Sequence, residues 1–193
     1  MKQVNGEIPS LSQLEEEFRQ EKYKQNYRQV LRSTVYCLIT VAAVAVLVAT
    51  LFLPVLQIYG SSMTPSLNEG NIVISLKGTK CQQGDIISFY YNNKILVKRA
   101  LAFSGDWVDI DDEGNVFVNS KLLEESYITD KSLGECDIEL PYQVPDGKIF
   151  VMGDHRSTSV DSRSSTVGTV SEEEIVGEIV FRIWPLSEFG PIK

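Results

Sequence analysis

The dominant pattern in the chain is a long uncharged apolar stretch, followed by many short apolar segments. No Asp, Glu, Lys or Arg occurs from Ser33 to Asn68, and Leu, Ile, Val and Ala dominate from Val35 to Ile58. A helix that crosses a bilayer needs about 20 apolar residues. The pattern therefore predicts a transmembrane helix over residues 33–56 that ends near Pro54, because proline disrupts a helix interior.

Two other interpretations of this stretch fit less well. A buried helix of a soluble domain usually keeps a polar stripe, which this stretch lacks. A cleaved signal peptide has a shorter apolar core that lies closer to the start of the chain.

The flanks of the apolar stretch predict its orientation. Five basic residues precede it closely, whereas no Lys or Arg follows it until Lys77; the five are Arg19, Lys22, Lys24, Arg28 and Arg32. The positive-inside bias places residues 1–32 in the cytoplasm, with residues 11–32 as a charged helix, and residues 57–193 outside. We therefore expect a single-pass protein of the plasma membrane with an extracytoplasmic domain.

Beyond the apolar stretch, short runs rich in β-branched residues alternate with turn signals. The runs are Asn71–Leu76, Asp85–Tyr91, Lys94–Ala102, Trp107–Ile110, Val116–Asn119, Lys148–Met152 and Ile179–Trp184. Regular short strands with tight turns are typical of an antiparallel sandwich or barrel-like domain. We expect a mainly β fold with an antiparallel β-sheet, in which the poorly patterned residues 120–143 form a surface excursion.

Composition excludes some classes of function. The chain has 193 residues and a formal net charge of −8. Residues 1–32 carry six Lys/Arg and five Glu, a net +1, so the rest of the chain carries −9. An acidic domain without a basic cluster argues against nucleic-acid binding. The three cysteines match no metal or redox motif; Cys37 lies in the predicted span, and whether Cys81 pairs with Cys136 stays open.

A serine and a lysine carry the candidate chemistry. Ser62 follows Gly60 in a turn-like segment, and the N–H of Ser62 is a candidate oxyanion donor. Lys98 would share one face of a strand with apolar neighbours, which favours the neutral amine that a general base requires. The chain has one histidine, so a Ser-His-Asp triad would have to use His155. Each signal alone also fits an ordinary turn, surface lysine or ion pair.

The order of several motifs resembles bacterial type I signal peptidases, membrane-bound Ser/Lys proteases, and in particular Gram-positive members. The similar segments are Gly60-Ser61-Ser62-Met63-Thr64-Pro65-Ser66-Leu67, Gly84-Asp85-Ile86-Ile87-Ser88-Phe89, Val97-Lys98-Arg99 with Ser104-Gly105-Asp106, Gly153-Asp154-His155-Arg156-Ser157-Thr158-Ser159-Val160-Asp161-Ser162-Arg163, and residues 175–186. Three positions depart from the family pattern, which more often has threonine at Ser66, proline at Ser104 and asparagine at His155.

The resemblance implies a signal-peptidase-like catalytic domain that needs no metal or cofactor. It implies that Ser62 is the nucleophile and Lys98 the general base. It further implies that the Ser159 hydroxyl orients the lysine amine, and that Asp161 and Arg163 form a supporting ion pair. The backbone N–H groups of Gly60 and Ser62 would form the oxyanion hole, and His155 would be a turn residue.

The implied substrates are signal-peptide-bearing preproteins with small residues at −1 and −3, the A-x-A pattern. Such a segment would add as a strand beside residues 56–60 and the Lys98 strand, near the lipid bilayer. The expected pocket walls are Ile58, Ile72, Leu96 and Val97. Among the aromatic residues, Tyr90, Tyr91, Trp107 and Trp184 are candidates for the bilayer interface, although a core position is favoured for Trp184 and for Phe181.

Two other functions stay open from the sequence. One is a different Ser/Lys protease, such as a self-cleaving repressor or a processor dedicated to a few substrates; the membrane span argues against the repressor. The other is a membrane-tethered binding domain that keeps the fold but lacks catalysis.

Overall fold

The structure is a computed structural model that describes residues 11–192. It divides into two compact units, the first ending at Ala49 and the second beginning at Thr50. Residues 1–10 of the predicted cytoplasmic segment lie outside the described residues.

The first unit consists of the helix α1 (Leu11–Phe52), which continues into the start of the second unit. It contains an apolar window with a mean hydropathy of 2.6 and no buried residue, and it is long and apolar enough to cross a membrane. The uncharged part of the helix, residues 33–52, spans about 30 Å at 1.5 Å per residue, the thickness of a bilayer's hydrocarbon core. The helix therefore fits a single-pass membrane protein.

The helix ends earlier than the sequence predicts. It stops at Phe52, two residues before Pro54, and the strand β1 (Val55–Gln57) follows. Residues 55 and 56 therefore belong to the sheet, and the predicted boundary at residue 56 is wrong by four residues. Proline ends the helix here, and the β-branched Val55 begins the strand.

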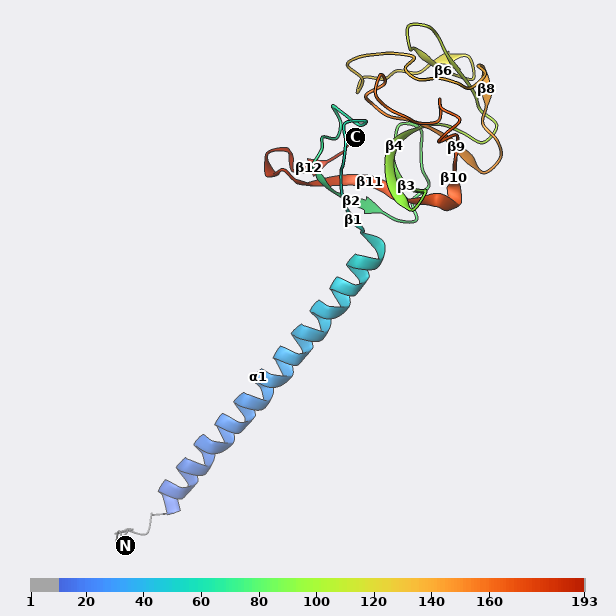
Figure 1. Ribbon diagram of the computed structural model, residues 1–193. Helices are drawn as coiled ribbons and strands as arrows, with labels where there is room; N and C mark the ends of the chain where they lie inside the picture. Colours follow the sequence, from blue (N-terminus) through green and yellow to red (C-terminus); the bar gives the residue numbers. More distant parts are fainter. Residues whose placement is uncertain (1–10, 193) are drawn as a thin grey trace. The chain divides into compact units, whose positions relative to one another are not determined.

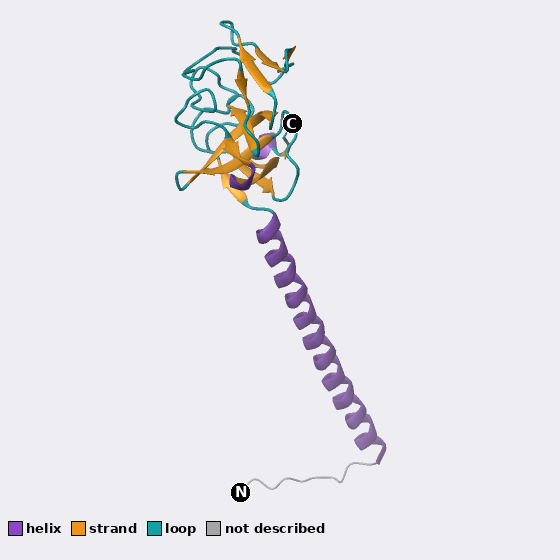
Figure 2. Ribbon diagram, turned by 90° about the vertical axis from the view of Figure 1, so that its right-hand side faces the viewer, coloured by secondary structure: helices purple, strands orange, loops and turns teal. Residues whose placement is uncertain are grey.

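The second unit is built of strands and loops with two short helical turns, η1 (Glu172–Glu174) and η2 (Leu186–Glu188) (Figure 2). Its main sheet has the order β1-β2-β11-β3-β4-β9-β10, with β12 beside β11 (Figure 1). The bounds are β2 (Ile72–Leu76), β3 (Ile86–Tyr91), β4 (Lys94–Phe103), β9 (Lys148–Met152), β10 (Val170–Ser171), β11 (Ile175–Trp184) and β12 (Gly190–Pro191). Neighbouring strands pair antiparallel, as predicted for the fold class.

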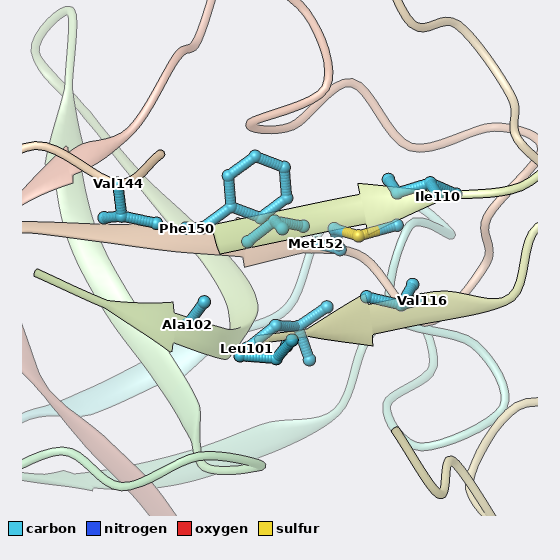
Figure 3. Packing of buried hydrophobic residues seen from close by; sticks show 9 residues of the cluster. Leu101, Ala102, Ile110, Val116, Val144, Phe150 and Met152 are labelled. Carbon is cyan, nitrogen blue, oxygen red and sulfur yellow. The ribbon is translucent and has the colours of Figure 1, made fainter. Parts of the chain in front are cut away.

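A smaller antiparallel sheet has the order β7-β6-β5-β8. Its strands are β5 (Trp107–Ile110), β6 (Val116–Val118), β7 (Lys121–Leu122) and β8 (Tyr142–Gln143). Side chains of β5 and β6 pack against β4 and β9, and Leu101, Phe150 and Met152 fill the space between the two sheets (Figure 3). The two sheets therefore share one core.

Besides β10 and β12, the main sheet has open edges at β1 and along the first half of β4. β1 pairs only with β2, and β9 pairs with β4 from Arg99 onward, so the first half of β4 has a neighbour only in β3. Unpaired backbone donors and acceptors on such an edge can accept another strand.

The strand predictions are confirmed within one or two residues, except that β11 begins at Ile175 rather than Ile179. The core prediction for Trp184 is wrong, because this side chain is 51% exposed at the end of β11. Cys81 and Cys136 are both free thiols.

Candidate active site

Ser62 lies in a turn between β1 and β2 that two buried side chains fix to the core. These are Met63 and Leu67, which pack in one cluster with Ile58 and Val73. The Leu67 N–H donates to the Met63 carbonyl at 2.8 Å, which closes the turn. We call residues 60–67 the Ser62 turn.

Gly60 begins this turn with a φ of +81°, in the left-handed region that glycine adopts without strain. No atom lies within 4 Å of the position that a Cβ would take. The glycine is therefore required by backbone conformation and not by crowding.

Lys98 lies on β4, opposite Ile87 of β3, and its residue is only 4% exposed. The pKa of its amine is lowered from 10.5 to about 8, mainly by burial and less by the positive charge of Arg163, against the opposing charges of Asp161 and Asp154. An appreciable fraction of this lysine is therefore neutral near physiological pH.

Ser62 and Lys98 line the same groove, of about 560 Å³, with Gly60 beside them. Three of the four predicted pocket residues, Ile58, Leu96 and Val97, also line it. Ile72 does not, because it lies on β2 opposite Gln57, one strand behind the edge strand β1. A separate cavity of about 460 Å³, beside Cys81 and Ile175, contains neither Ser62 nor Lys98.

Residues 153–163, the site loop, follow β9 and contact the Ser62 turn directly. The His155 N–H donates to the Ser62 carbonyl at 3.0 Å. A Cβ on Gly153 would lie 2.5 Å from that same carbonyl oxygen and 2.6 Å from the Ser159 Cβ. Ser159 and the Ser62 backbone thus meet at Gly153, a role that the local sequence does not reveal.

Ser159 is buried in this loop. Its hydroxyl makes no hydrogen bond of good geometry within residues 11–192, although it lies close enough to the Asp161 carboxylate to help lower the pKa of that group. A buried hydroxyl without a well-aligned hydrogen bond calls for an explanation, and a role in the site is one.

Asp161 and Arg163 form a buried ion pair within the site loop, with Nε and Oδ1 2.9 Å apart. Asp161 also accepts from the Gly153 N–H at 2.9 Å, and the Arg163 guanidinium donates to the carbonyls of Arg156 and Ser159. Burial alone would raise the pKa of Asp161, but the hydrogen bonds and charge of Arg163 hold it below its ordinary value. Through these hydrogen bonds within the site loop, the ion pair holds the loop in a fixed conformation.

Two further buried ion pairs were not predicted from the sequence. Arg99 pairs with Asp154 at 2.7 Å, and Arg156 pairs with Glu125. Three of these residues lie in the quoted motifs, but their charge and spacing alone do not reveal a partner. Only Glu125, from the poorly patterned excursion, carried no motif signal at all.

The ring of His155 is engaged with the Ser62 turn. Its Nδ1 lies 3.1 Å from Thr64 Oγ1. Within residues 11–192, no group of three or more His, Cys, Asp or Glu side chains is arranged to hold a metal ion.

Several known proteins are similar to this chain over most of its length. Residues 31–184 match the protein family described as signal peptidase, peptidase S26. The chain is 35% identical over 168 residues to the thylakoidal processing peptidase 1 of Arabidopsis thaliana chloroplasts, which covers 76% of this chain and 48% of the relative. It thus spans about half the length of that relative.

It is also 34% identical over 152 residues to signal peptidase IB of Staphylococcus aureus, covering 68% of this chain and 78% of the relative. Among solved structures, it resembles a signal peptidase I from Enterococcus faecalis with 28% identity and a TM-score of 0.43, over 52% of this chain and 97% of that one.

Proposed function

Because this chain belongs to the signal peptidase family, peptidase S26, we propose that it removes signal peptides from exported preproteins with a Ser62–Lys98 dyad. The observation that carries the mechanism is that Ser62 and a buried Lys98 line one groove. No other lysine among the described residues is buried.

The proposed reaction begins with neutral Lys98. Its amine takes the Ser62 proton, and Ser62 Oγ attacks the scissile carbonyl. The N–H groups of Ser62 and Gly60 stabilise the oxyanion, and protonated Lys98 gives its proton to the leaving amine. Water activated by Lys98 then releases the acyl group from Ser62.

The lowered pKa of Lys98 supports its role as the base. At pH 7, a pKa of about 8 leaves about one lysine in ten neutral, whereas a pKa of 10.5 leaves about one in 3,000. The lowered pKa thus increases the population of the neutral amine about 300-fold. The Ser159 hydroxyl and the Asp161–Arg163 pair would hold the amine in position.

The open edges support binding of an extended substrate. Ile58 exchanges hydrogen bonds with residues 70 and 71, and Ala100 with residues 84 and 85. By the two-residue alternation of a strand, the backbone groups of Gln57, Ile95 and Val97 point to the open side. A peptide strand in the groove would therefore bond to β1 and β4 at once.

The walls of the groove support a preference for small residues. Ile58 is buried, and Leu96 and Val97 are half-buried, so apolar surface faces the bound strand next to Ser62. Alternate side chains of the substrate would enter there, and large ones would clash. This favours the A-x-A pattern at −1 and −3.

We further propose that α1 anchors the enzyme in the plasma membrane, with residues 1–32 in the cytoplasm and the β domain outside. The basic residues before the apolar part of α1 support this orientation. Confinement of enzyme and preprotein to one bilayer raises their effective concentration without new contacts.

The test is cleavage of a purified preprotein with an A-x-A site, in detergent and across pH. Wild type should cleave, with a rate that rises with pH through about 8, while Ser62→Ala and Lys98→Ala should be inactive. The exposed residues Ser187 and Lys121 provide matched controls, and S187A and K121A should cleave like wild type.

Other outcomes would redirect the assignment. Cleavage by Lys98→Ala would mean that another group is the base. Uncut preprotein with wild type, but cleavage within a peptide library, would indicate a dedicated processor. If wild type cleaved neither the preprotein nor the library, the result would favour a binding domain without catalysis.

A further inference from the structure

Arg99, the neighbour of Lys98 in sequence, joins three separate segments around the groove. Its guanidinium donates to both oxygens of Asp154 at 2.9 and 2.7 Å, and to the Gly84 carbonyl at 2.6 Å. It also donates to Ser66 Oγ at 3.1 Å. One side chain therefore connects the Ser62 turn, the turn before β3 and the site loop.

A tyrosine covers the flat face of this guanidinium. Arg99 Cζ lies 3.7 Å from the centre of the Tyr127 ring. The Tyr127 hydroxyl donates to Glu125 at 3.0 Å, and Glu125 pairs with Arg156 of the site loop. Tyr127 and Glu125 both belong to the excursion, residues 120–143, so this segment contacts two arginines of the site.

We propose that Tyr127 is a positioning residue for the reaction: its ring keeps Arg99 on Asp154 and Ser66, and so keeps the site loop and the Ser62 turn in register with Lys98. This inference rests on the proposed function. It assigns the excursion a part in catalysis, although it contributes no residue to the groove.

The Tyr127 ring covers a face of the Arg99 guanidinium that the hydrogen bonds of Arg99 leave open. The four bonds of Arg99 lie around the edge of the guanidinium, and they leave its faces to be covered by other atoms. An aromatic ring over a cation keeps water away from the cation. The ring also attracts the cation electrostatically, and this attraction is stronger when the pair is desolvated. Arg99 is 2% exposed, so this condition holds.

The position of Arg99 affects the pKa of Lys98 through the charged groups near the Lys98 amine. The groups that act on its amine are Asp161 and Asp154, which favour the protonated form, and Arg163, which opposes it. Arg99 neutralises Asp154. When the ring is lost and Arg99 loosens, Asp154 acts on Lys98 with more of its charge, and a higher pH is needed to free the amine.

The experiment compares Tyr127→Leu and Tyr127→Phe with wild type in the full-length chain, measuring kcat and KM on the A-x-A preprotein from pH 6 to 10. Tyr142→Leu is the matched control. Tyr142 lies at the other end of the same excursion, and its ring packs against the hydrophobic core, with its centre 5.9 Å from that of the Phe150 ring.

We expect Tyr127→Leu to lower kcat at pH 7 about threefold to tenfold, with KM within about twofold, and to move the rise of activity by about half to one pH unit toward alkaline pH. Tyr127→Phe, which keeps the ring, should restore the wild-type profile. Tyr142→Leu should lower thermal stability without moving the profile.

A parallel loss of activity at every pH, a change in KM alone, or a Phe variant as impaired as the Leu variant would overturn the proposal. Tyr127→Met gives the same comparison should the Leu variant not fold. Competitive labelling of the Lys98 amine across pH, read by mass spectrometry, reports its titration without any cleavage. A wild type that does not cleave would refute the proposed function, while the labelling would still decide the role of Tyr127.

Discussion

Replacing Gly153 by alanine is expected to damage the active site by adding a single methyl group. The new Cβ would lie 2.5 Å from the Ser62 carbonyl oxygen and 2.6 Å from the Ser159 Cβ. Contacts this short do not occur between such atoms, so the Ser62 turn and the site loop must move apart. The His155–Ser62 backbone hydrogen bond lies at the same junction and would lengthen.

The size of the effect follows from the two kinds of cost. Overpacking a tight interior costs about 1–3 kcal/mol, which corresponds to a fall in Tm of about 3–10 °C for a domain of this size. Displacing a nucleophile by up to about 1 Å costs on the order of 100-fold in rate. We therefore expect kcat to fall far more than the loss of stability alone would explain.

Gly177 provides the matched control. A Cβ there would lie 2.5 Å from the Leu76 carbonyl and 2.6 Å from Ser75 Oγ, which is equally crowded, but this glycine lies on β11 and does not line the groove. Thermal unfolding and preprotein cleavage, measured well below Tm, should show similar stability losses for both variants. Gly177→Ala should keep kcat within about threefold of wild type.

Two results would refute this reasoning. Wild-type kcat in a destabilised Gly153→Ala would show that the contact does not position Ser62. An equal loss of kcat in Gly177→Ala would show that activity follows overall stability and not this junction.

Two further variants test the charges of the site. Since folding lowers the pKa of Lys98 from 10.5 to about 8, the unfolded chain binds the extra proton between these values, and the stability of wild type rises with pH there. Lys98→Met should therefore be inactive yet more stable at pH 7, by up to about 3 kcal/mol, and this gain in free energy of unfolding should vanish by about pH 10.5 in denaturant titrations. Asp154→Asn leaves the buried Arg99 without its counter-charge and should lower the free energy of unfolding by about 3 kcal/mol, whereas the exposed Glu173→Gln should change it by less than about 0.5 kcal/mol.

Local patterns were sufficient to predict most of the fold. The uncharged stretch predicted the apolar part of α1, because helix length and bilayer thickness are linked by simple geometry. Alternation and turn residues predicted seven strands, since each strand carries its own periodicity. The order of the motifs also predicted that Ser62 and Lys98 meet, and both line the groove.

Contacts between distant segments could not be predicted. The pairing of Glu125 with Arg156 joins residues 31 positions apart, and nothing in either local sequence specifies the other. Ile72 was wrongly predicted to line the groove. The order of the strands in the sheet decides which strand forms the edge, and the sequence of a single strand does not specify that order. Trp184 is apolar enough for a core position. It is, however, the last residue of β11, and its side chain is exposed there.

The open edges of β1 and β4 also bear on product release and self-association. A strand edge that accepts one extended peptide accepts others, including a strand from a second copy of the same chain. Here β1 is only three residues long, and the unpaired part of β4 begins with a lysine, Lys94. Short edges and a terminal charge limit the number of backbone bonds that any occupant can form. We therefore expect a cleaved peptide to leave quickly and edge-to-edge pairing between two copies of the chain to be weak.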